Sequence, residues 1–342
     1  MSQLRRQTND RPPPSVTSPG EDLVTALLSL WMMVGLFADG WAHRHVDGLE
    51  SFWTPSHGLF YSGFAATAGW VLWVVAVRRR RREPVPPGYP LTLVGVAVFA
   101  AGGVGDAVWH TLFGVETSVD ALFSPTHLLL FAGIALVVTT PLRAFRHRST
   151  TDRPPFGAFV PVVVSVTLLV VGAQFTFMWA AGLNIGAPAF PFLPGSVGQF
   201  RVGAGVLAIL LTTAIVFGPG LWMASRWRPP AGAFTVVLGT LGVLMQLLEG
   251  FADLWEVVPP LAGGVVADVL VAVLEPTVSR PRRFHLFAFV APVALWSIYF
   301  AVFEMVDTVR WPPEMWAGTI GWSGVVGLGM SMLVVAGHDL PR

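Results

Sequence analysis

The segment VLAILLTTAIVF, residues 206 to 217, contains no charged side chain, and VPVVVSVTLLVV, residues 160 to 171, has the same character. Such runs are typical of apolar helices of about 20 residues, which cross a bilayer at about 1.5 Å per residue. Over all 342 residues, 54% are hydrophobic and 12% are charged. A soluble domain has roughly twice that share of charged residues. The sequence therefore predicts an all-α integral membrane protein, with the lipid bilayer as its surroundings.

Hydropathy divides the chain into about ten predicted transmembrane helices, arranged as five helical hairpins. We expect a disordered cytoplasmic tail over residues 1–20, two hairpins that carry the candidate site over 21–148, and three more hairpins of the same membrane domain over 149–342. The predicted spans are 22–45, 55–77, 90–113, 124–143, 157–181, 200–225, 232–255, 259–278, 285–309 and 313–337.

The basic residues predict the orientation in the membrane. All 21 of them are arginine, and they gather in the N-terminal tail and in alternate loops, such as residues 78–82 and 143–153. Arginine-rich loops stay on the cytoplasmic side, so both termini are expected there, in the plasma membrane of a bacterium. Between apolar spans these clusters are topology signals, and we expect no nucleic-acid partner. The absence of cysteine excludes disulfides and thiolate metal sites.

One pattern of polar residues occurs twice near the predicted outer ends of the first two hairpins. Each copy has an aspartate and a histidine one helical turn apart. A second histidine follows on the far side of a loop, directly after a Pro-Ser or Pro-Thr dipeptide. Six ionisable groups in register inside apolar segments are more than packing requires. The two copies are Asp39, His43 and His57, and Asp106, His110 and His127.

Local geometry lets each copy converge on one ion. Residues four apart share a helix face, with about 6 Å between their Cβ atoms. Thr54 and Ser124 can cap the next helix, each with proline at its first position, which places the second histidine in the first turn. Two histidines and one carboxylate form a transition-metal ligand set. The sequence thus predicts a metal site in each hairpin, near the outer face of the membrane.

Weaker echoes of the pattern occur in the later hairpins. Glu249, Asp253 and Glu304 lie within predicted spans and have no histidine partner in the pattern. They are candidate proton-relay groups or extra ligands, or polar contacts between hairpins. A single intramembrane His or Asp is often an interhelical hydrogen bond, and this reading applies to these three residues more than to the six-residue pattern.

Asp106-Ala-Val-Trp-His110 and Phe123-Ser-Pro-Thr-His127 resemble a metal-binding segment of the membrane-embedded C subunit of the copper monooxygenases. This superfamily includes the particulate methane, ammonia and hydrocarbon monooxygenases. The resemblance covers residues 35–130 and implies copper at both three-residue sets. The loop before His127 is longer than in that family, and residues 150–342 have no counterpart there.

The resemblance implies a copper-dependent monooxygenase, an oxidoreductase that uses O2 on a small apolar substrate or ammonia. It also implies partners, either other membrane subunits or a soluble cupredoxin-like chain. The ligand types alone equally admit iron or zinc. Two other functions fit the sequence: a proton- or metal-ion-coupled transporter, for which intramembrane carboxylates are typical, and a non-catalytic subunit stabilised by metal. The catalytic residues stay open at this level.

Overall fold

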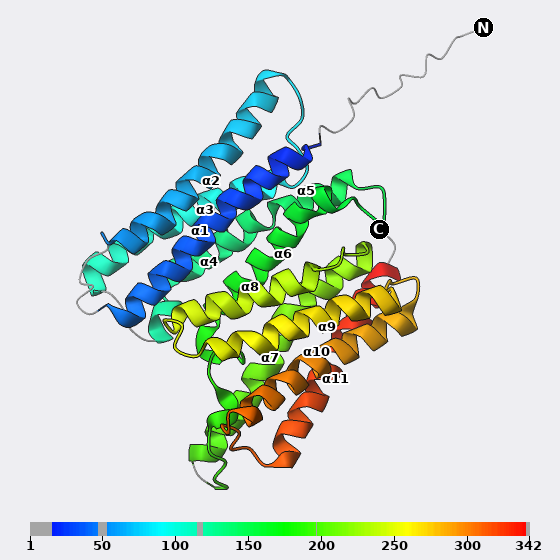
Figure 1. The fold of residues 1–342 in the computed structure, drawn as a ribbon. Coiled ribbons are helices and arrows are strands. Elements are labelled where there is room, and N and C mark those ends of the chain that lie inside the picture. Colours follow the sequence, from blue (N-terminus) through cyan, green and yellow to red (C-terminus); the bar gives the residue numbers. More distant parts are fainter. Residues whose placement is uncertain (1–15, 47–52, 115–118, 196, 340–342) are drawn as a thin grey trace.

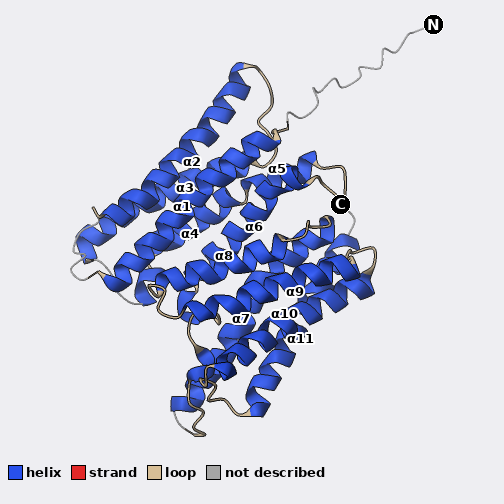
Figure 2. Cartoon of the chain, viewed as in Figure 1, coloured by secondary structure: helices blue, strands red, loops and turns tan. Residues whose placement is uncertain are grey.

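The computed structural model describes residues 16–46, 53–114, 119–195 and 197–339, and within these ranges every regular element is helical (Figure 2). Most of the predicted tail lies outside the described residues, and the first helix begins at Pro19. The helices are α1 (Pro19–His45), α2 (Pro55–Arg80), α3 (Tyr89–Phe113), α4 (Pro125–Val138), α5 (Thr140–Arg148), α6 (Phe156–Thr176), α7 (Val197–Arg226), α8 (Ala233–Leu248), α9 (Val258–Leu274), α10 (Pro281–Met305) and α11 (Pro313–Asp339), with the 3-10 turns η1 (Val119–Leu122), η2 (Met178–Ala180), η3 (Ala187–Ala189) and η4 (Leu254–Val257).

The chain is a helical protein with the helix lengths of an integral membrane protein. Nine apolar segments among the described residues are long enough to cross a membrane, with α4 and α5 together forming one of them. Helix α8 is apolar but shorter. These ten correspond in order to the ten predicted spans. Most helix boundaries fall within a few residues of the predicted ones, because hydropathy and proline caps both act locally.

Helix α8 ends earlier than predicted. The span was expected over 232–255, whereas the helix stops at Leu248 and a turn follows. Gly250 and Phe251 both have positive φ, at 66° and 58°, and this conformation cannot continue a right-handed helix. The polar residues of this segment therefore lie in a turn and in η4, because backbone geometry overrides hydropathy here.

Glycines set the close packing within the first hairpin. A Cβ at Gly35 on α1 would lie 2.5 Å from the Cα of Phe60 on α2, and one at Gly63 would lie 2.6 Å from the Cα of Met32. These distances are shorter than real Cβ contacts, so only glycine lets the two backbones approach this closely. The resulting contact fixes the ends of α1 and α2 relative to one another.

The second hairpin repeats this device. A Cβ at Gly133 on α4 would lie 2.8 Å from the backbone nitrogen of Phe99 on α3, and one at Gly102 would lie 3.0 Å from that of Leu130. Gly35 and Gly102 each come four residues before the aspartate of their hairpin. Gly63 and Gly133 each come six residues after the second histidine. The repeat thus includes the residues that hold each hairpin together.

Helix α6 joins the two hairpins to the rest of the molecule. It contacts α1, α4 and α5 on one side and α7 and α8 on the other, and Figure 1 shows it in the middle of the array of tilted helices. Helices α9, α10 and α11 form the far side and pack in sequence on one another. Phe175 of α6 lies against Gly40 of α1, where a Cβ would come within 2.6 Å of its ring. This brings the end of α6 to the end of the first hairpin.

Candidate metal centre

Capping residues place the second histidine of each set. Thr54 precedes Pro55 at the start of α2, and its side-chain oxygen accepts a hydrogen bond from the backbone N–H of His57. Ser124 does the same for His127 at the start of α4. Both histidines therefore lie in the first turn of their helix, as predicted.

Each hairpin gathers its three residues around one carboxylate. The Oδ2 atom of Asp39 lies 3.6 Å from Nε2 of His43 and 3.4 Å from Nε2 of His57. In the second hairpin, Oδ1 of Asp106 lies 3.5 Å from Nε2 of His110 and 3.1 Å from Nε2 of His127. Asp106 is 1% exposed, so its charge is held away from solvent.

The two sets form one continuous cluster. The four imidazole rings lie in a row, with centroid separations of 5.4 Å from His43 to His57, 6.3 Å from His57 to His110 and 5.7 Å from His110 to His127. His57 belongs to both halves: its ligand atom lies within 4.8 Å of those of Asp39 and His43, and also of those of Asp106 and His110. The two sets are therefore adjacent. The distance between them could not be predicted from the sequence.

Backbone carbonyls fix the tautomers of two histidines. Nδ1 of His110 contacts the carbonyl oxygen of Gly114 at 3.2 Å, and Nδ1 of His127 contacts that of Ala121. A carbonyl oxygen only accepts, so both Nδ1 atoms carry the proton. In the neutral ring Nε2 then has a lone pair, which here faces the carboxylate of Asp106. Acceptor facing acceptor is unfavourable unless the imidazoles are protonated or a cation lies between them.

Two hydroxyl groups orient the carboxylate of Asp106. Thr126 donates to Oδ1 at 3.1 Å, and Tyr61 of α2 donates to Oδ2 at 3.3 Å. By contrast, Oδ1 of Asp39 is buried and has no hydrogen-bond partner among the described residues. A buried carboxylate oxygen in that state has an unsatisfied lone pair, which a cation would satisfy.

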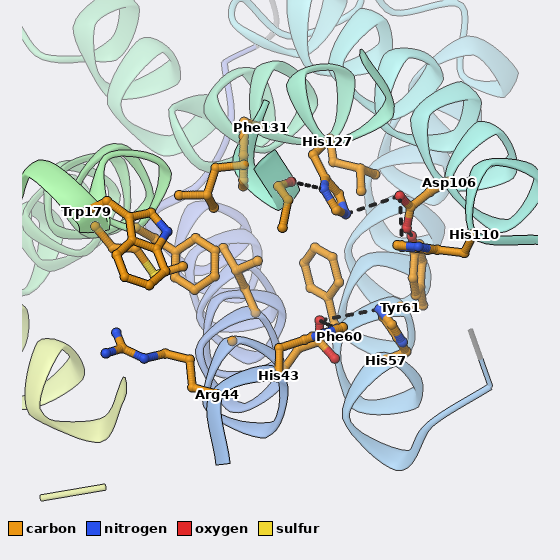
Figure 3. Close-up of a pocket in the computed structure, with 18 residues that line it drawn as sticks. His43, Arg44, His57, Phe60, Tyr61, Asp106, His110, His127, Phe131 and Trp179 are labelled. Atoms are coloured by element: carbon orange, nitrogen blue, oxygen red, sulfur yellow. Dashed lines mark hydrogen bonds and ion pairs between the residues drawn. The ribbon is translucent and has the colours of Figure 1, made fainter. Parts of the chain in front are cut away.

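All six residues line one cavity of about 80 Å³. Figure 3 shows the histidines and Asp106 on one side of it, with Arg44 and Trp179 on the other. The remaining wall is largely apolar and comes from four helices and the short turns beside them. Its apolar members are Leu36, Phe60, Leu122, Leu130, Phe131, Phe175 and Met178.

The three additional carboxylates lie outside the described lining of this cavity. Glu249 forms an ion pair with Arg44, at 2.8 Å, and so links α8 to the end of α1. Asp253 accepts a hydrogen bond from Nε1 of Trp255, and Glu304 lines a separate cavity beside α11. Glu249 thus reaches the cavity only through Arg44.

Tyr61 and the aromatic side chains of the α6 end are functional candidates that the sequence pattern did not identify. Tyr61 comes four residues after His57, as Phe131 comes four residues after His127, so the repeat contained a signal for both. Phe175 and Trp179 are remote in sequence from both hairpins and carry no comparable signal. Their position follows from the packing of α6 on α1.

Comparisons with protein-family models, curated proteins and solved structures found no match to this chain. The geometry of the cavity and the chemistry of its six polar residues are therefore the basis for assigning a function.

Proposed function

We propose that this chain is a membrane metal protein that binds copper at two adjacent sites and oxidises a small apolar molecule or ammonia with O2. Asp39, His43 and His57 hold one ion, and Asp106 and its two histidines hold the other. The observation that carries the proposal is the orientation of the Nε2 lone pairs of His110 and His127 toward the buried carboxylate of Asp106.

A cation explains this arrangement better than protonation. Protonation of both histidines around Asp106 would place two imidazolium charges beside a single carboxylate, and the two cations would repel one another at short range. One metal ion beside each carboxylate satisfies the lone pairs and the negative charge together. Imidazole and carboxylate suit copper, iron and zinc, and the resemblance to the copper monooxygenases favours copper.

When bound, copper would supply the activation of O2. The protein's own groups hold the ligands and enclose the reactants. The carbonyls of Gly114 and Ala121 orient two imidazoles, and the hydroxyls of Thr126 and Tyr61 orient the carboxylate of Asp106. Supporting hydrogen bonds of this kind preserve ligand geometry. The apolar wall excludes water, and a volume of about 80 Å³ admits only a molecule of a few heavy atoms.

The proposed orientation follows from the arginines. Ten transmembrane helices in five hairpins put both termini in the cytoplasm, beside the arginine-rich loops. The metal cavity then faces the outer side, because it lies where α1 ends and α2 begins. Other membrane subunits or a soluble cupredoxin-like chain are proposed partners for electron delivery.

Elemental analysis of detergent-purified protein tests the metal sites. The wild type is expected to hold about two copper ions per chain, and His43→Ala and His110→Ala about one each. His45→Ala is the matched control, since His45 is exposed on α1 and its one hydrogen bond among the described residues is to the carbonyl of Trp41. Absence of bound metal after incubation with copper, iron and zinc would refute the proposal. Metal flux into proteoliposomes would favour a transporter instead.

A further inference from the structure

A second cavity lies on the other side of the metal cluster, along the seam between α2 and α3. Its volume is about 740 Å³, and among the residues that line it the polar ones are few. It runs from Thr54 to Phe64 along α2, a length of about 15 Å at 1.5 Å per residue. We call this cavity the α2–α3 groove. Residues of α2 and α3 line it, among them Gly58 and Tyr61 of α2 and Gly103 and Ala107 of α3.

Small residues leave this space open. Ala100, Gly103 and Ala107 follow one another along one face of α3, opposite α2. Helices α2 and α3 make few contacts with one another, in contrast to the glycine-packed pairs within each hairpin. Val104 and Val108, at the edge of the groove, are 71% and 52% exposed. In a membrane these side chains face the acyl chains, so the groove opens to the hydrocarbon.

Two residues line both the groove and the metal cavity: His57 and Tyr61. Tyr61 fits closely between them, because its hydroxyl donates to Asp106 and its ring packs on Gly103, where a Cβ would lie 2.8 Å from Cε1. His57 offers a ligand atom to both groups, Asp39 with His43 and Asp106 with His110. His57 and Tyr61 are therefore the side chains through which the groove and the metal cavity meet among the described lining residues.

We propose that the α2–α3 groove is the entrance by which a small apolar molecule dissolved in the bilayer reaches the metal cavity, with the Tyr61 side chain as its gate. Rotation of Tyr61 away from Asp106 opens the partition, and its return closes the cavity around the molecule. The reaction of the molecule at the metal rests on the proposed function, whereas entry through the groove does not require a bound metal. The polar side of the cavity, at Arg44 and Glu249, is unsuited to an apolar molecule.

A small photoreactive alkane tests the route on metal-free protein in phosphatidylcholine vesicles. The probe is 3-ethyl-3-methyldiazirine, which partitions into the bilayer and inserts into nearby bonds on illumination. Fragmentation mass spectrometry then locates the label residue by residue on α4. Labelling at Leu130 and Phe131, which line the metal cavity, is counted as α4 labelling, and labelling at the exposed neighbours Leu128 and Leu129 is excluded because these face the lipid. The wild type is expected to be labelled there.

Matched substitutions decide whether the label enters through the groove. Gly58→Leu fills the groove, and Gly69→Leu is its control on the same helix, since a Cβ at either position meets no atom within 4 Å. We expect at least a five-fold loss of α4 labelling in Gly58→Leu and none in Gly69→Leu. Tyr61→Phe, which frees the ring from Asp106, is expected to increase the labelling.

A second pair of substitutions, on α3, tests the same route independently, in case the α2 variants do not fold. Ala107→Trp blocks the groove from α3, and Val94→Trp places the same side chain on an exposed part of α3 outside the groove. Equal labelling of α4 in all variants would overturn the proposed entrance. Metal analysis of the same proteins distinguishes the two proposals. If the protein binds metal and the groove substitutions leave the α4 labelling unchanged, only the proposed entrance is refuted. The expected labelling without any bound metal refutes the metal function and retains the entrance.

Discussion

Gly35→Ala tests whether close packing of α1 on α2 positions the first metal set. A Cβ at Gly35 would lie 2.5 Å from the Cα of Phe60. Real Cβ contacts are essentially never under 3.0 Å and are ordinary from 3.4 Å, so the backbones must separate by at least 0.5 Å, and by 0.9 Å to restore ordinary contact. Overpacking of this kind costs about 1–3 kcal/mol. The obstacle is backbone and not the end of a flexible side chain, so the strain cannot be relieved by a rotamer change.

The same displacement affects the metal ligands directly. Asp39 lies one turn after Gly35, and His57 lies one turn before Phe60, so both ligands move with the separating helices. Metal sites tolerate distance errors of only about 0.2 Å. We therefore expect Gly35→Ala to lose the metal of the first set and to retain that of the second.

The assay combines elemental analysis with thermal unfolding in detergent. Gly69→Ala on α2 is the control. Its Cβ meets nothing within 4 Å, so it should leave the copper content unchanged and should not lower the melting temperature. A Gly35→Ala protein with the wild-type copper content and melting temperature would show that the hairpin contact does not determine the geometry of the site.

Three further predictions concern the surroundings of the site and the opposite end of the helices. Thr126→Val removes one hydroxyl donor to Asp106 and is expected to weaken metal binding by about 10- to 100-fold, measured by competition with a chelator, whereas an unchanged affinity would contradict a supporting role. Glu249→Gln breaks an ion pair whose two side chains are 25% and 28% exposed. It is expected to cost at most about 1 kcal/mol and to leave the metal content unchanged; loss of metal would instead make Glu249 part of the site. The hydrogen bond from Arg280, followed by that from Arg228, lowers the pKa of Glu275 below its ordinary value of 4.5. A lowered folded-state pKa gives stability that is present above pH 4.5 and is lost as the pH falls from 4.5 through the folded-state value. The melting-temperature difference between wild type and Glu275→Gln is therefore expected at pH 7 and should disappear once the pH is below the folded-state pKa; a constant difference would contradict it.

Much of the fold could be predicted because its determinants are local. The helix starts at Pro55 and Pro125 depend on a capping residue and a proline, which are adjacent in sequence. The spans depend on hydropathy over about 20 residues. The early end of α8 could not be predicted in this way, since it depends on positive φ at Phe251, a residue type that rarely adopts this conformation.

The candidate site was predictable within each hairpin and not between them. Spacing along a helix brings Asp106 and His110 together, and the cap adds His127. The adjacency of His57 and His110 depends on how two hairpins pack, and no periodicity encodes that angle. The wall from α6 was missed for the same reason, because Phe175 reaches the cavity through a contact with Gly40.

The repeated hairpins also have a consequence for how two equivalent halves become different. Tyr61 of the first hairpin corresponds to Phe131 of the second, yet the Tyr61 hydroxyl crosses over and donates to the carboxylate of the other half. Asp106 thus shares its electron density with two hydroxyls, while Oδ1 of Asp39 has no such donor among the described residues. A carboxylate without donors is the stronger base, so two ions held here would differ in reduction potential. The two hydroxyl donors, Tyr61 and Thr126, thus make the two carboxylates of the repeated pattern chemically unequal.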